Sequence, residues 1–194
     1  MPIAPKRPPN SMTAASVRTG ATCDDDFASC GTGTELDQVV YAQRDATFYG
    51  AELQTELDIA PIWRGMWGIE GRYDFVHATF EDGTFVPKIS PHRLGGGVYY
   101  RDANWRARIS LLHAFSQNQI ATFETSTNGY NLLNAELSYT MKLDPFAGAN
   151  REFVLGVKGE NLLDDDIRNH VSSKKAEVLQ PGRSVRLFGT VRFN

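Results

Sequence analysis

Residues 181–194 read PGRSVRLFGTVRFN, and this stretch decides the fold class. From Val185 to Phe193 the odd positions carry Val, Leu, Gly, Val and Phe, whereas the even positions include Arg186 and Arg192. One apolar and one charged face with a period of two residues is typical of a β-strand. The apolar face suits the core of a soluble sandwich, or the lipid around an outer-membrane barrel whose arginines face a wet lumen.

Alternation of this kind recurs along the chain and predicts an all-β protein. No segment has a convincing 3.6-residue period, so we expect no helix. Residues 1–36 are rich in Pro, Gly, Ser, Thr and Asp, which predicts an irregular leader or loop segment, followed by strands over 37–194. A weak eighth strand is expected at about 36–43. The seven clear ones are expected at 47–57, 65–79, 93–101, 105–115, 130–141, 152–159 and 185–193.

Three further patterns favour a membrane barrel over a sandwich. Short turns at about 58–64, 102–104 and 143–151 alternate with longer polar loops at 80–92, 116–129 and 161–182, as in outer-membrane barrels. Aromatic residues gather near strand ends, where interfacial girdles lie. Charged residues fall inside strands, mainly opposite the apolar set: Glu52, Glu56, Glu70, Arg72, Asp74, Arg106, Arg108, Glu136, Lys158, Arg186 and Arg192.

Charge and hydropathy exclude two classes of protein. The chain has 194 residues, with 20 basic and 23 acidic ones and a formal net charge of −3. Since the basic residues form no stripe, nucleic-acid binding is not expected. No apolar run reaches the ~18 residues of a membrane helix. The first twenty residues also lack the apolar centre of a secretory signal.

The two cysteines, Cys23 and Cys30, are separated by six residues in CDDDFASC. In an exported protein this spacing predicts a small loop closed by a disulfide, whereas in the cytosol both would be free thiols. A metal site at these thiols is not expected, because no second Cys or His pair is near.

Four histidines raise the question of a metal site. His92 and His170 fall in predicted long loops, and Asp164 lies in the second of these loops. Imidazole and carboxylate suit zinc or a similar ion, so these three are weak candidate ligands. No pair has ligand spacing on one element. Because no nucleophile, Gly-rich phosphate loop or paired-acid motif is present either, we expect no enzyme and no cofactor.

Five strings, in order, resemble TonB-dependent outer-membrane receptors. The resemblance covers about residues 37–194 and is nearest to receptors for metals and metal chelates. The strings are QRDATFYGAELQTEL (43–57), PKISPHRLGGGVYYRDANWRARISLLHAF (87–115), TNGYNLLNAELSY (127–139), GVKGENLLDDDIRNHVS (156–172) and PGRSVRLFGTVRF (181–193).

The resemblance implies a 22-stranded barrel of which this chain is the last third. Nothing matches the family's plug domain or its TonB-contacting box, so we expect a C-terminal receptor fragment. The implied activity is uptake of a metal, metal chelate, haem or similar scarce nutrient across the outer membrane. The implied partners are outer-membrane lipid, the barrel-assembly machinery through the C-terminal strand, the TonB complex in a full-length receptor, and an unidentified nutrient.

Two alternatives stay open at this point. One is a complete eight-stranded outer-membrane barrel that acts as a porin or adhesin, with an interior filled by side chains. The other is a soluble β-sandwich that serves as a binding module.

Overall fold

The computed structural model describes residues 13–23, 30–31, 37–122, 124–146 and 149–193. Every regular element in these ranges is a β-strand. This confirms the all-β prediction. The strands are β1 (Thr13–Cys23), β2 (Cys30–Gly31), β3 (Asp37–Gln43), β4 (Ala46–Ile62), β5 (Gly65–Phe80), β6 (Arg93–Arg101), β7 (Trp105–Ala114), β8 (Tyr130–Phe146), β9 (Ala149–Glu160) and β10 (Ser184–Phe193).

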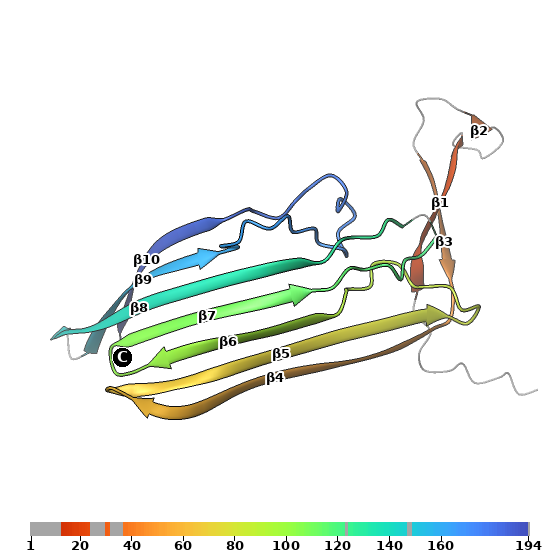
Figure 1. Ribbon diagram of the computed structural model, residues 1–194. Coiled ribbons are helices and arrows are strands. Elements are labelled where there is room, and N and C mark those ends of the chain that lie inside the picture. The colour runs from red at the N-terminus through yellow and green to blue at the C-terminus, as the bar shows by residue number, and fades with distance from the viewer. Residues whose placement is uncertain (1–12, 24–29, 32–36, 123, 147–148, 194) are drawn as a thin grey trace, which may run out of the picture. The chain divides into compact units, whose positions relative to one another are not determined.

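Seven of these strands form one antiparallel meander in the order β10-β9-β8-β7-β6-β5-β4, and they lie side by side in Figure 1. These are the seven strands that alternation predicts. Each is hydrogen-bonded to its neighbours in the chain, so every connection is a hairpin. Residues 63–64 and 102–104 make short turns, whereas residues 81–92, 115–129 and 161–183 make long loops. In a meander, alternate connections lie at the same end, so the short turns share one end and the long loops the other.

The weak eighth segment forms β3, but β3 belongs to a separate three-stranded sheet of order β2-β1-β3. β1 and β2 lie within residues 1–36, where the composition predicts no regular structure. The sequence of β1, TAASVRTGATC, has small and β-branched residues and only one aliphatic side chain larger than alanine, Val17, so its alternation is weak. Its strand character comes from pairing with β3, in which Val17 partners Val40.

Three strands are clearly longer than alternation predicts: β4 has 17 residues, β8 has 17 and β9 has 12. In β4 the apolar pattern stops before Pro61, yet the strand continues through it. β4 is an edge strand of the described sheet, and an edge tolerates a proline because one side of its backbone has no ladder to complete.

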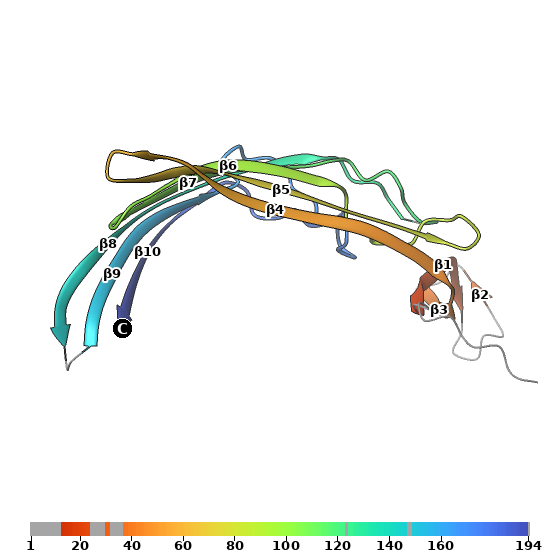
Figure 2. The same cartoon turned by 90° about the horizontal axis from the view of Figure 1, so that it is seen from below.

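The described chain divides into two compact units. One comprises Met1–Tyr49, His77–Ile89 and Gln119–Ser126, and the other comprises Gly50–Val76, Ser90–Asn118 and Thr127–Asn194. The second unit holds most of the seven-stranded sheet. Within it, β8, β9 and β10 bend together along matching paths in Figure 2.

The strand register gives the sheet two chemically different faces. The row Arg108, Glu136, Lys158 and Arg186 crosses four strands on one face, which we name the charged face. One residue further along, the row Ile109, Ala135, Gly159 and Val185 crosses the same strands on the other, which we name the apolar face. The alternation read from the sequence is therefore the alternation between these two faces.

The apolar face is exposed. Ile109 is 53% exposed, Val185 65% and Leu187 82%. A sandwich buries one whole face of each sheet against the other. Here the buried apolar side chains of the described residues are few and scattered: Ala78, Phe80, Tyr99, Ala114, Val154 and Ile167. Within the described residues, the sheet therefore lacks the core that the sandwich alternative requires.

Candidate functional site

Ion pairs that join different strands cover the charged face. Arg101, at the end of β6, contacts Asp58 of β4 at 2.7 Å and Glu56 at 3.3 Å. Arg108 of β7 reaches the same Glu56 at 3.5 Å and Glu70 of β5 at 3.2 Å. Three carboxylates from β4 and β5 thus share two guanidinium groups from β6 and β7.

Two smaller groups continue this pattern. Near the long-loop end, Asp74 of β5 accepts a hydrogen bond from Arg93 of β6 at 2.8 Å. At the β9–β10 edge, Glu160 contacts both Lys158, at 3.0 Å, and Arg186.

These pairs give the face its polarity rather than its stability. The side chain of Arg108 is 50% exposed and that of Arg101 is 47% exposed. Exposed ion pairs of this kind contribute roughly 0–1 kcal/mol each. The network gives this face a polar surface. Its half-exposed guanidinium and carboxylate groups can bind water, or other polar groups that lie against the face, in place of one another.

Aromatic rings cover two glycines on the charged face. Gly68 lies opposite Tyr99, and a Cβ at Gly68 would stand 2.3 Å from the tyrosine ring. Gly156 lies opposite Phe188, and its Cβ would stand 2.4 Å from that ring. Only glycine leaves room for the ring to lie across the neighbouring strand. The Tyr99 hydroxyl then donates to Asp58 at 2.7 Å, which connects the ring to the ion-pair network.

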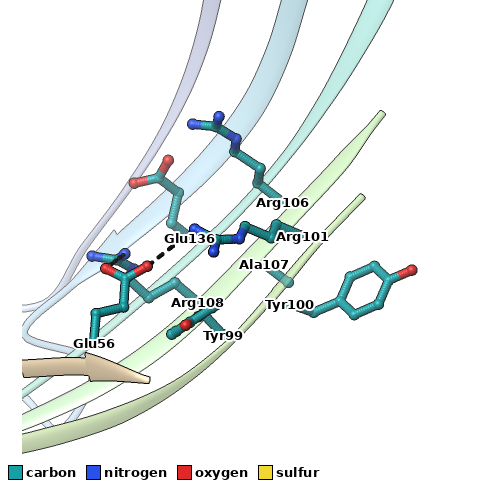
Figure 3. Close-up of a pocket in the computed structure, with 8 residues that line it drawn as sticks. All are labelled: Glu56, Tyr99, Tyr100, Arg101, Arg106, Ala107, Arg108 and Glu136. Atoms are coloured by element: carbon teal, nitrogen blue, oxygen red, sulfur yellow. Dashed lines mark hydrogen bonds and ion pairs between the residues drawn. The ribbon is translucent and has the colours of Figure 1, made fainter. Parts of the chain in front are cut away.

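A cavity of about 380 Å³ opens on the charged face beside the β6–β7 turn (Figure 3). Arg101 and Arg106 are partners across the hairpin. Figure 3 shows the arginine side chains on one side of the strands, whereas Tyr100 points away. Guanidinium and carboxylate groups can bind polar groups of either sign here. The lining residues are Glu56, Tyr99, Tyr100, Arg101, Arg106, Ala107, Arg108 and Glu136.

The turn beside this cavity is held by Asp102. Its carboxylate accepts hydrogen bonds from the backbone N–H groups of Trp105, at 2.6 Å, and Asn104, at 2.7 Å. These two bonds favour the ionised form and hold the pKa of Asp102 below its usual value. The turn therefore keeps the two arginine-bearing strand ends in a fixed register.

Two pairs of rings, which we name the two aromatic bands, lie toward the two ends of the apolar face at β7. Near the short turns, Trp105 and Tyr139 lie with ring centroids 4.7 Å apart. Near the long loops, His113 and Phe115 have the same centroid spacing, 4.7 Å. Trp105 and His113 are eight positions apart on β7. At roughly 3.3 Å per residue this is about 26 Å along the strand, or about 20 Å of bilayer depth for a tilt near 40°. Such a spacing is close to the ~25 Å apolar band of membrane barrels.

The candidate metal ligands make separate contacts. His92 lies beside Tyr73 and Phe75, with ring centroids 6.5 Å and 5.3 Å away. His170 is 2% exposed, and its Nδ1 lies 2.9 Å from the Thr127 hydroxyl. The Lys175 ammonium lies 3.4 Å from the same nitrogen. Because it is positively charged, it disfavours binding of a metal ion at His170.

Asp164, the third candidate ligand, is engaged elsewhere. Its carboxylate accepts the backbone N–H of Arg183 at 2.7 Å, and this bond, together with the Arg183 guanidinium, lowers the pKa of Asp164. The structure does not bring Asp164 together with either histidine through any described contact. Over the described ranges, no group of three or more His, Cys, Asp or Glu side chains could hold a metal ion. A metal role for these residues stays a prediction.

Sequence reasoning missed Asn161, which organises the loop between β9 and β10. It is 2% exposed and has a positive φ of 49°. Its side chain bonds the backbone of Asp165 in both directions, each at 3.0 Å, and its own N–H donates to Asn134 at 3.1 Å. Asp165 in turn accepts the N–H of Asn131 at 2.7 Å. The string NLLDDD, quoted above only for its resemblance, was the available signal.

The predicted disulfide partners, Cys23 and Cys30, are Cα partners in the pairing of β1 with β2. The described residues form no helix that is long and apolar enough to cross a membrane.

One comparison with known protein families bears on this geometry. The family model described as "TonB dependent receptor-like, beta-barrel" matches residues 13–162. The match runs from the start of β1 to just past the end of β9.

Proposed function

Because the chain belongs to the TonB-dependent receptor β-barrel family, we propose that it forms part of the wall of a receptor for a metal ion, metal chelate or haem. The family resides in the outer membrane and takes up nutrients; it consists of transporters rather than enzymes. The preference for a metal-containing nutrient is supported by the order of the five strings quoted above.

The observation that carries the proposal is the two-faced sheet. An exposed apolar surface over seven strands would aggregate in water. In a bilayer the same surface is buried in lipid, and the two aromatic bands lie at the two interfaces. The charged face then lines the lumen, where water surrounds its half-exposed ion pairs.

In this arrangement the charged face has a defined role in uptake. A nutrient that passes along the lumen meets alternating guanidinium and carboxylate groups, so neither sign of charge is excluded. The cavity beside Arg101 and Arg106 provides polar contacts near the short-turn end. The TonB complex supplies the energy in the full-length receptor, and this chain contributes the wall.

The alternative of a complete eight-stranded barrel is not favoured. Its eighth strand would be β3, and β3 pairs with β1 in the separate sheet.

Tryptophan fluorescence tests the orientation of the sheet. All three tryptophans lie on the apolar side or in a turn: Trp67 and Trp105 on the apolar face, and Trp63, 85% exposed, between β4 and β5. In vesicles of brominated phospholipid we expect strong quenching, greatest when the bromines are near the headgroups. Quenching no stronger than that of a soluble tryptophan would exclude lipid contact at this face.

Nutrient uptake tests the second half of the proposal. In cells that carry the receptor, deletion of the segment encoding β4–β10 should abolish accumulation of one nutrient from a panel of radiolabelled metal ions, metal chelates and haem. A strain in which the segment is restored provides the control. Unchanged accumulation of every compound in the panel would contradict the uptake proposal.

A further inference from the structure

The three-stranded sheet holds two cysteines that the proposed uptake function does not use. Cys23 is the last residue of β1, and Cys30 is the first residue of β2. They are the only two cysteines of the chain. The backbone pairs them directly, as one of the two residue pairs that join these strands.

The register satisfies the distance that a disulfide requires. Directly opposed residues of antiparallel strands have Cα atoms about 4.5 Å or about 5.5 Å apart, depending on the type of pair. Cysteines joined by a disulfide have Cα atoms roughly 4.4–6.8 Å apart. Either type of pair therefore fits without movement of the backbone. We propose that Cys23 and Cys30 form an intrachain disulfide that holds β2 on β1.

The bond would add to the few backbone pairs that hold the described part of β2 on β1. β2 has two residues, and its pairing with β1 consists of Thr22 with Gly31 and Cys23 with Cys30. A ladder of two pairs is too short to persist unaided in water. By contrast, β1 pairs with β3 along most of its length, from Thr13 to Thr22. Among the described residues, β2 has the fewest backbone pairs of the three strands, and the disulfide would add a covalent attachment to them.

Formation of the bond is a two-electron oxidation. Each thiol loses one hydrogen, the two sulfurs join, and an oxidised disulfide of a thiol–disulfide oxidoreductase accepts both electrons and both protons and becomes a dithiol. Such oxidants act outside the cytosol. The oxidation step thus relies on the outer-membrane location of the family, whereas the register argument is independent of what the receptor transports.

Mass spectrometry of the full chain from outer membranes tests whether the bond exists. Trypsin has no cleavage site between Arg18 and Arg44, so one peptide, residues 19–44, carries both cysteines. We expect this peptide to be two hydrogen atoms lighter than its reduced form and to resist an alkylating reagent added before reduction. Alkylation of both cysteines, or a disulfide between two chains, would overturn the proposal.

A glutathione equilibrium tests whether the strand register causes the pairing. We expect the effective concentration of the two thiols to be at least tenfold higher in the folded chain than in urea. A matched control exchanges Cys30→Gly with Gly31→Cys, which shifts one thiol by a single position and onto the opposite face of the strand. Its effective concentration should fall toward the value in urea. Equal values for the folded chain and either the control or the unfolded chain would refute the register argument, whatever the uptake experiments show.

Discussion

Replacement of Ile109 by arginine would place a charge at the middle of the apolar face. Ile109 is 53% exposed on β7, four positions from Trp105 and four from His113. Four residues span about 13 Å of strand, or about 10 Å of depth at a tilt near 40°. The side chain therefore lies midway between the two aromatic bands.

The expected cost follows from this depth. An arginine on the lipid face costs about 2–4 kcal/mol at the bilayer midplane and close to 0–1 kcal/mol near the interfaces. We therefore expect Ile109→Arg to lower the free energy of unfolding in phospholipid vesicles by about 3 kcal/mol, which is roughly a hundredfold change in the folding equilibrium. Urea titration followed by tryptophan fluorescence measures it.

The neighbouring Ser110 provides a matched control. It lies on the same strand but on the charged face, opposite Gly97, in a cavity that Glu56 and Glu70 also line. Ser110→Arg should cost less than about 1 kcal/mol, because its charge stays hydrated. A larger loss for Ser110→Arg than for Ile109→Arg would mean that the two faces are assigned the wrong way round.

Three further outcomes are expected. Gly156→Val should lower the free energy of unfolding by about 1–3 kcal/mol in urea titrations, because a Cβ at position 156 would stand 2.4 Å from the Phe188 ring. Gly96→Ala should lower it less, because a Cβ at position 96 would stand 3.5 Å from its nearest atom. A double-mutant cycle between Arg108 and Glu70 should give a coupling free energy below about 1 kcal/mol, and this energy should decrease at high salt. A coupling free energy above about 2 kcal/mol would show that the charged face is shielded from water. Because the pKa of Asp164 is lowered, the stability that its bond gives to the loop is fully present above pH 3.8, the ordinary pKa, and is lost as the pH falls through the lower pKa of the folded chain. Cleavage of the loop by an acid-stable protease should therefore rise over that pH range in the natural chain. The Asp164→Asn variant should not show this rise.

The strands of the large sheet were predictable because its two faces have opposite chemistry on alternate residues. Val185 and Arg186 differ in polarity for this reason, and the same rule holds across β4–β10. β1 was not predictable in this way. Its only aliphatic side chain larger than alanine is Val17, so its alternation is weak, and its strand conformation depends on its pairing with β3.

The arrangement of the charged face was predictable in kind but not in detail. The sequence indicates that Glu56, Glu70 and Arg108 share a face. It does not indicate that Arg108 reaches both carboxylates, because that depends on the register between strands far apart in the chain. Asn161 was missed for a similar reason, since its role depends on contacts with Asn134 on another strand.

The direction of the two edge strands constrains any closed structure that includes this sheet. In an antiparallel meander the direction reverses at each step, so β4 and β10, the first and last of seven strands, run the same way. They cannot close onto each other, nor can β10 of one copy join β4 of a second, without a parallel seam. A fully antiparallel barrel needs an even number of strands. The remainder of such a barrel must therefore contribute an odd number of strands, and its two outermost strands must both run opposite to β4 and β10.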